Sequence, residues 1–206
     1  MIVKICGVRT PDDALAALDA GTDMLGFNFY EPSPRYIAPA ACARLVAHLR
    51  QRGATATLVG VFVNLPPVQV AAILDECGLD LAQLHGDEPP ADLAALAGRA
   101  FKAIRPRDLP EARAQAAAYS LGAPPAGAPA LLVDAAAVGA YGGSGQVTNL
   151  DLAAALAAQT RLLLAGGLRP DNVAAAVAAV QPWGVDVASG VESAPGVKDP
   201  AKMTEF

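Results

Sequence analysis

Short apolar runs alternate with helix-like segments from one end of this sequence to the other. Each run is followed by sequence of helical character, and this alternation predicts an α/β chain with a parallel sheet. The runs are mostly continuous rather than alternating with polar residues, which is typical of parallel strands covered on both faces. The eight runs are 2–6, 24–29, 57–63, 81–85, 101–105, 130–134, 161–166 and 184–189.

The number of runs favours a closed barrel over an open sheet. Eight units in 206 residues match the shortest chains that form a (β/α)8 TIM barrel, so a single barrel domain is expected over residues 1–206. An open, doubly wound sheet is the alternative. Such a sheet normally carries a glycine-rich phosphate turn after its first strand, whereas here the glycine turns follow the seventh and eighth runs.

Local signals indicate where several helices begin. Thr10 is a suitable cap for a helix that starts at Pro11, because threonine accepts hydrogen bonds from N–H groups of the first turn and proline fits that turn. A second helix is expected at about 39–52. Pro170 is expected in the first turn of the helix after the seventh run.

Composition and charge disfavour several classes of protein. The chain is 53% hydrophobic, which indicates a sizeable core, and no apolar run approaches the roughly 18 residues of a membrane span. A net charge of −5 without a lysine or arginine cluster disfavours a nucleic-acid partner. Three scattered cysteines and two distant histidines disfavour a metal site. Since the first run begins at Ile2 and leaves no room for a signal peptide, we expect a reduced, cytoplasmic chain.

Glycine turns after the last two runs predict a phosphate site. Gly166 and Gly167 follow the seventh run, and Ser189 and Gly190 follow the eighth. Glycine lets the backbone approach phosphate oxygens closely, and N–H groups at a helix start carry partial positive charge. Tight turns without a ligand are the alternative.

A longer loop, residues 135–148, follows the sixth run. Its glycines are Gly139, Gly142, Gly143 and Gly145. The length and composition of this loop suggest a lid that covers a site, and an insertion without function is the alternative.

Polar residues end several runs, and the carboxyl ends of barrel strands carry functional side chains. They are Cys6, Asn28, Asn64, His85, Arg105, Asp134 and Asp186. The Cys6 thiol can act as a base or nucleophile if nearby positive charge lowers its pKa from about 8.5, or it can be a small buried hydrophobe. A sheltered carboxyl at Asp134 can donate a proton, or it can cap a loop.

The sequence leaves two or more possible roles or positions open for each of three residues. Arg35 lies in a loop stiffened by proline, where its guanidinium can hold a substrate carboxylate with two hydrogen bonds or remain an exposed charge. His85 can be a core histidine, a partner of a catalytic residue or a ligand contact. Lys4 lies either inside the barrel near Cys6 or on its outside.

Together these segments resemble the phosphoribosylanthranilate isomerase family, whose members are barrel enzymes of tryptophan biosynthesis. KICG, SPRY, QLHG and SGVE carry the most specific part of the resemblance, and the matches follow family order across nearly the whole chain. The matching segments are KICG (4–7), GFNFYEPSPRYI (26–37), VGVFVN (59–64), QLHGDE (83–88), LLVD (131–134), GGSG (142–145), LAGGLRPDNV (164–173), GVDVASGVE (184–192) and PGVKDPAKM (195–203).

The resemblance implies an Amadori rearrangement of N-(5-phosphoribosyl)anthranilate by general acid–base catalysis, without cofactor or metal. It implies that Asp134 is the general acid and Cys6 the general base. The implied substrate-binding residues are Arg35 for the anthranilate carboxylate, Asp186 near the amine, and His85. The implied phosphate-binding residues are Gly143, Gly166, Gly167, Ser189 and Gly190. Family members are monomers or homodimers, so both states are expected.

One segment departs from the family pattern, and two other functions compete with this reading. Thr148-Asn149-Leu150 stands where the family usually has Phe-Asp-Trp, which puts the anchoring of the loop in doubt more than the reaction type. Another phosphate-binding barrel enzyme acting on a sugar phosphate is the first rival; a Schiff-base aldolase fits poorly because Lys102 lies near the start of its run. A non-catalytic phosphate-binding protein, which would need neither Cys6 nor Asp134, is the second.

Overall fold

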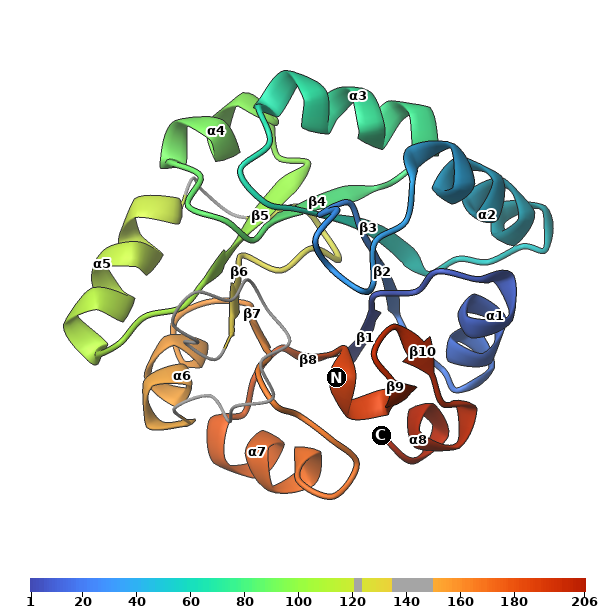
Figure 1. The fold of residues 1–206 in the computed structure, drawn as a ribbon. Coiled ribbons are helices and arrows are strands. Elements are labelled where there is room, and N and C mark those ends of the chain that lie inside the picture. The colour runs from blue at the N-terminus through green and yellow to red at the C-terminus, as the bar shows by residue number, and fades with distance from the viewer. Residues whose placement is uncertain (121–123, 135–149) are drawn as a thin grey trace.

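The computed structural model describes residues 1–120, 124–134 and 150–206, and within them eight parallel strands close into a barrel (Figure 1). Each strand pairs with the next in sequence, and β8 pairs with β1, which confirms the expected (β/α)8 architecture. The barrel strands are β1 (Ile2–Cys6), β2 (Met24–Asn28), β3 (Thr57–Phe62), β4 (Leu81–Leu84), β5 (Ala100–Ile104), β6 (Leu131–Val133), β7 (Leu162–Leu164) and β8 (Gly184–Val187).

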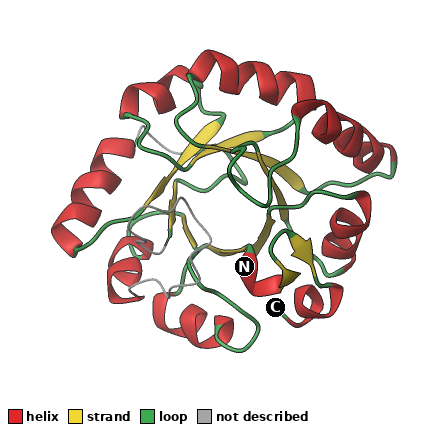
Figure 2. Cartoon of the chain, viewed as in Figure 1, coloured by secondary structure: helices red, strands yellow, loops and turns green. Residues whose placement is uncertain are grey.

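Helices surround the barrel on its outside, as Figure 2 shows. Many of them begin with proline in the first turn, where its missing N–H has no helical partner to lose. Thr10 caps the first helix as predicted, since its Oγ1 accepts from the N–H of Asp13 at 3.1 Å. The helices are α1 (Pro11–Asp19), α2 (Pro39–Gln51), α3 (Pro67–Cys77), α4 (Pro90–Ala95), α5 (Leu109–Tyr119), α6 (Leu150–Ala157), α7 (Val173–Val180) and α8 (Pro200–Glu205).

The structure corrects two expectations near the C-terminus. Helix α7 begins at Val173, so Pro170 lies in a turn before the helix rather than in its first helical turn. That turn is held by the side chain of Asn172, whose Oδ1 accepts from the N–H of Arg169 at 2.8 Å. After β8 the chain does not enter a helix directly. A short 3-10 helix, η1 (Ser189–Val191), leads into an antiparallel hairpin of β9 (Glu192–Ala194) and β10 (Val197–Lys198) before α8.

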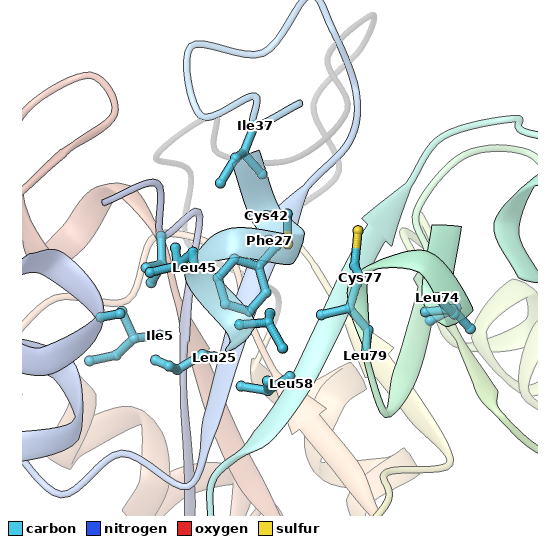
Figure 3. Close-up of a cluster of buried hydrophobic side chains, with 14 of the residues drawn as sticks. Ile5, Leu25, Phe27, Ile37, Cys42, Leu45, Leu58, Leu74, Cys77 and Leu79 are labelled. Carbon is cyan, nitrogen blue, oxygen red and sulfur yellow. The ribbon is translucent and has the colours of Figure 1, made fainter. Parts of the chain in front are cut away.

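Side chains of the barrel strands pack in two layers, because successive residues of a strand point to opposite faces. Figure 3 shows part of the outer layer, where Leu25, Phe27 and Leu58 pack with Leu45 of α2 and Leu74 of α3. The inner layer fills the barrel with side chains from successive strands. They include Met24, Val59, Leu81, Phe101, Leu132 and Leu163. This apolar plug supports the polar residues at the carboxyl ends of the strands.

Lys4 lies inside the barrel, which settles a choice that the sequence leaves open. Its side chain is fully buried, and its ammonium forms an ion pair of 2.6 Å with Asp186 Oδ1. The strand register explains the contact, because Lys4 of β1 stands beside Asp186 of β8. The pair therefore links the first and last strands at the seam where the barrel closes.

A second buried lysine, Lys102 of β5, points outward, and its ammonium lies over the ring of Tyr119 on α5 at 5.7 Å. It donates to the carbonyl oxygens of Leu84 and Gly86 and to Glu88 Oε2 at 2.9 Å. Burial lowers the pKa of Lys102, and the attraction of Glu88 offsets only part of that effect. This contact fixes the loop that follows β4, and it places the lysine away from the barrel mouth.

We expect Lys102→Met to lower the free energy of unfolding by about 3–5 kcal/mol, because it leaves the buried Glu88 carboxylate without its cation. Arg99→Met is the matched control, since its ion pair with Asp75 is largely exposed and is worth less than about 1 kcal/mol. Urea unfolding of the two variants measures the difference. Equal losses of stability would show that the buried pair carries no special weight.

Candidate active site

Most of the polar residues predicted at the barrel mouth line one pocket with a volume of about 270 Å³, whereas Asn64 and Arg105 are not part of its lining. It lies at the carboxyl ends of the strands, where barrel folds place their chemistry. The predicted site residues among its lining are Cys6, Arg35, His85, Asp134, Gly166, Gly167, Asp186 and Ser189. A larger hollow of about 600 Å³ lies outside the barrel against α4 and α5, but its described lining contains no carboxylate, thiol or imidazole. The mouth pocket is therefore the candidate active site.

Cys6 ends β1 in the interior of the barrel, with only 8% of its surface exposed. Burial raises the pKa of the thiol, and the neighbouring ammonium of Lys4 offsets this only in part. A thiolate at neutral pH would require positive charge to lower this pKa. The positive charge is present, but desolvation outweighs it and the negative charge of Asp186 adds to the rise. The resting thiol is therefore protonated at neutral pH.

Asp134 follows β6 and is joined to His85, which follows β4. His85 Nε2 lies 3.0 Å from Asp134 Oδ2, and both side chains are buried. The other ring nitrogen, Nδ1, lies 2.6 Å from the side-chain amide nitrogen of Gln83. His85 is therefore a hydrogen-bond partner of Asp134 and also lines the pocket. Gln83 is not among the predicted site residues, although it stands in the QLHG motif and faces the same side of its strand as His85.

Arg35 lies in the loop after β2, but a carboxylate of the protein already holds its guanidinium. Its Nε and Nη2 donate to the two carboxylate oxygens of Glu192 at 2.8 and 2.7 Å. Lys198 of β10 also donates to Glu192 at 2.9 Å. Burial works against ionisation of Glu192, but the hydrogen bonds from Arg35 and Lys198 prevail and lower the pKa of that carboxyl. The exposed-charge reading of Arg35 is thus wrong, since only 13% of its side chain is accessible.

Glu192 and Lys198 were not predicted as site residues. The SGVE motif contains Glu192, but its partner Arg35 is 157 residues away in sequence. Only the unexpected hairpin of β9 and β10 brings Glu192 and Lys198 beneath the Arg35 loop. The consequence is a rigid guanidinium at the pocket rim, with Nη1 outside the pair with Glu192.

The two predicted glycine turns lie next to each other. Gly166 and Gly167 both have positive φ, 97° and 70°, a conformation that glycine adopts without strain. Gly190 packs so tightly against the carbonyl oxygen of Leu168 that any side chain would collide with it. Gly190 thus holds the two loops together, and it does not itself line the pocket, whereas Ser189 does. Gly143 and the predicted lid, together with Thr148 and Asn149, lie outside the described residues.

The described residues contain no cluster of three or more histidine, cysteine, aspartate or glutamate side chains suited to a metal ion. Within the same part of the chain, no helix is both long and apolar enough to cross a membrane. Cys6, Cys42 and Cys77 are all buried free thiols.

The chain matches known proteins over its whole length. The family model described as N-(5'-phosphoribosyl)anthranilate (PRA) isomerase matches residues 3–206. A protein named N-(5'-phosphoribosyl)anthranilate isomerase from Pelobacter propionicus is 45% identical over 99% of this chain and 92% of its own length. A second, from Citrifermentans bemidjiense, is 48% identical over 98% of this chain and 92% of its own length.

Solved structures agree with the sequence matches. Phosphoribosyl anthranilate isomerase from Thermotoga maritima superimposes with a TM-score of 0.87 at 32% identity, covering 100% of this chain and 97% of that one. The Thermus thermophilus enzyme gives a TM-score of 0.84 at 36% identity, covering 100% and 96%. The chain therefore belongs to the N-(5'-phosphoribosyl)anthranilate isomerase family, which makes it an isomerase of tryptophan biosynthesis.

Proposed function

We propose that the mouth pocket catalyses the Amadori rearrangement of N-(5-phosphoribosyl)anthranilate to 1-(o-carboxyphenylamino)-1-deoxyribulose 5-phosphate, with Asp134 as general acid and Cys6 as general base. The observation that carries the proposal is that the thiol and the carboxyl line one pocket, beside the glycine turns after β7 and β8. A solved structure of a phosphoribosyl anthranilate isomerase, which superimposes with a TM-score of 0.84, is a complex with reduced 1-(o-carboxyphenylamino)-1-deoxyribulose 5-phosphate.

Asp134 acts first in the proposed sequence. Its carboxylic acid gives a proton to the ribose ring oxygen, the bond from that oxygen to C1′ breaks, and the electron pair of the amine forms a Schiff base. The Asp134 carboxylate that remains faces His85 Nε2 at 3.0 Å. A hydrogen bond from that nitrogen stabilises the developing negative charge, as preorganised donors do in enzyme sites.

Cys6 acts second. The thiolate, formed when the resting thiol releases its proton to water, removes the proton from C2′, and the electron pair of the C–H bond forms an enolamine. The enolamine takes a proton at C1′ and releases the proton of its C2′ hydroxyl, which gives the ketone. The electrons move within the substrate, so these steps need no external oxidant. The ammonium of Lys4, which attracts and hydrogen bonds the thiolate, opposes the cost of forming a charge in this buried position.

The remaining contacts bind the substrate. Arg35, oriented by Glu192, is the proposed ligand of the anthranilate carboxylate. Asp186 is proposed near the amine, while its Oδ1 stays paired with Lys4. Backbone amides of Gly166, Gly167 and Ser189, which line the pocket, are the proposed phosphate ligands, with Gly143 of the predicted lid. Gly190 supports them by letting the turns after β7 and β8 pack closely.

The proposed setting is the cytoplasm, where free thiols stay reduced, and the chain acts as a monomer or homodimer. One chain supplies all the described pocket residues. A solved Thermotoga maritima structure contains monomers generated from a dimeric phosphoribosylanthranilate isomerase, which supports keeping both states.

Cys6→Ala and Asp134→Asn are each expected to lower kcat at least about a hundredfold, because each removes a general acid or base. KM should change less. The disappearance of fluorescence from freshly made phosphoribosyl anthranilate measures the rate. Cys77→Ala, which removes a buried thiol on α3, controls for loss of a cysteine. Near-normal turnover in either active-site variant would remove that residue from its role.

Arg35→Ala is expected to raise KM mainly, because the substrate carboxylate loses its guanidinium partner in the ground state and the transition state alike. Steady-state kinetics with the same assay separates KM from kcat. Arg44→Ala changes an exposed arginine on α2 and serves as the matched control. A lower kcat at unchanged KM would contradict the binding role.

The pKa of Cys6 can be measured in a Cys42→Ala/Cys77→Ala background, where Cys6 is the one remaining thiol of the three in the sequence. Burial raises its pKa, so we expect the rate of alkylation by iodoacetamide to keep rising with pH past about 8.5, the pKa of an ordinary thiol. Adding Lys4→Met should move the curve to still higher pH, since the ammonium favours the thiolate. A curve that levels off below about pH 8 would contradict the raised pKa.

A further inference from the structure

Gln83 is a buried polar residue of the pocket that the reaction steps above leave unused. It stands on β4 with 1% of its surface exposed, and it lines the same pocket as Asp134. Its amide nitrogen lies 2.6 Å from His85 Nδ1. Its amide oxygen, Oε1, is buried and has no hydrogen-bond partner among the described residues. The contact with His85 is therefore the polar interaction that orients this amide.

The orientation of the amide decides where the imidazole carries its proton. An amide N–H can only donate, so Nδ1 must offer its lone pair. The single proton of the neutral ring then sits on Nε2, which faces Asp134 Oδ2 at 3.0 Å. The ring thus donates to Asp134 and has no free site for a second proton.

We propose that Gln83 is a positioning residue that keeps His85 neutral, with its proton on Nε2, and so supports Asp134 as a general acid. The inference rests on the proposed role of Asp134. A neutral Nε2–H stabilises the carboxylate that forms when Asp134 gives up its proton. A charged imidazolium would instead hold Asp134 as a carboxylate from the start, and the acid would have no proton to give.

The chemistry of residue 83 is specific to an amide. A carboxylate at the same place accepts hydrogen bonds only, so it attracts a proton to Nδ1 and charges a ring that already faces Asp134. An apolar side chain of similar length leaves the Nδ1 lone pair buried without a donor. Gln83→Glu and Gln83→Met therefore change the ring in two different ways.

Nitrogen-15 NMR of the imidazoles in the ligand-free protein tests the proposal directly. The sequence has two histidines, so His48→Gln leaves His85 as the one remaining ring and assigns its signals. At about pH 7 we expect the wild-type ring to carry a proton on Nε2 and none on Nδ1. In Gln83→Glu, Nδ1 should gain a proton. A proton on Nδ1 in the wild type, or a bare Nδ1 in Gln83→Glu, would overturn the proposal.

Kinetics supplies the second measurement. Gln83→Glu and Gln83→Met should each lower kcat roughly tenfold or more, the scale of one lost or misdirected hydrogen bond to a charged group, while KM changes less. Gln69→Met, an exposed change on α3, is the control and should leave both constants unchanged. If Gln83→Met folds and turns over like the wild type, the role of Gln83 is packing alone. The NMR result does not depend on whether Asp134→Asn is inactive, so failure of the acid role and failure of this inference are distinguishable.

Discussion

Closure of the barrel between β1 and β8 is the constraint on which the rest of the structure depends. The closing register sets Lys4 beside Asp186, and their buried ion pair lies under the mouth pocket. The same closure brings Cys6 of β1 to the same opening as Asp134 after β6. A buried ion pair is a poor source of stability, because desolvation consumes most of its attraction. Its value here is electrostatic, since the ammonium of Lys4 is the neighbouring charge that most favours a thiolate at Cys6.

The acid and the base of the proposed mechanism sit in different surroundings. The ammonium of Lys4 lowers the pKa of Cys6 and the carboxylate of Asp186 raises it. Burial of the thiol makes the net shift upward. Asp134 faces a ring nitrogen whose proton is governed by an amide one layer further into the barrel. The proposed mechanism needs Asp134 protonated and Cys6 deprotonated, so the buried thiol must first lose its proton, a step that the ammonium of Lys4 favours. Arg35 adds a rigid binding contact, fixed by Glu192 from the C-terminal hairpin.

Much of this arrangement can be predicted from the sequence. Eight apolar runs correspond to the eight barrel strands within a residue or two at each end, because continuous Val, Ile and Leu stretches report burial on both faces. Cys6, His85 and Asp134 are predictable at the mouth since they end such runs, and Asp186 since it lies next to the carboxyl end of β8. The hairpin of β9 and β10 is not, because Glu192–Lys198 has no periodic apolar pattern. Pro170 predicts the start of α7 too early, since proline suits a turn as well as a helix.

The sequence by itself determined the order of strands and helices, the fold class and the residues that end each strand, because these depend on local patterns of hydrophobicity and turn residues. Only the tertiary structure decided which of those residues act on one another. The pairs Lys4–Asp186, Arg35–Glu192 and His85–Asp134 join positions 182, 157 and 49 residues apart. Burial of Cys6, and with it the direction of its pKa shift, likewise follows from the closed barrel around it. Partners and desolvation arise from contacts between distant segments, which no local pattern in the chain records.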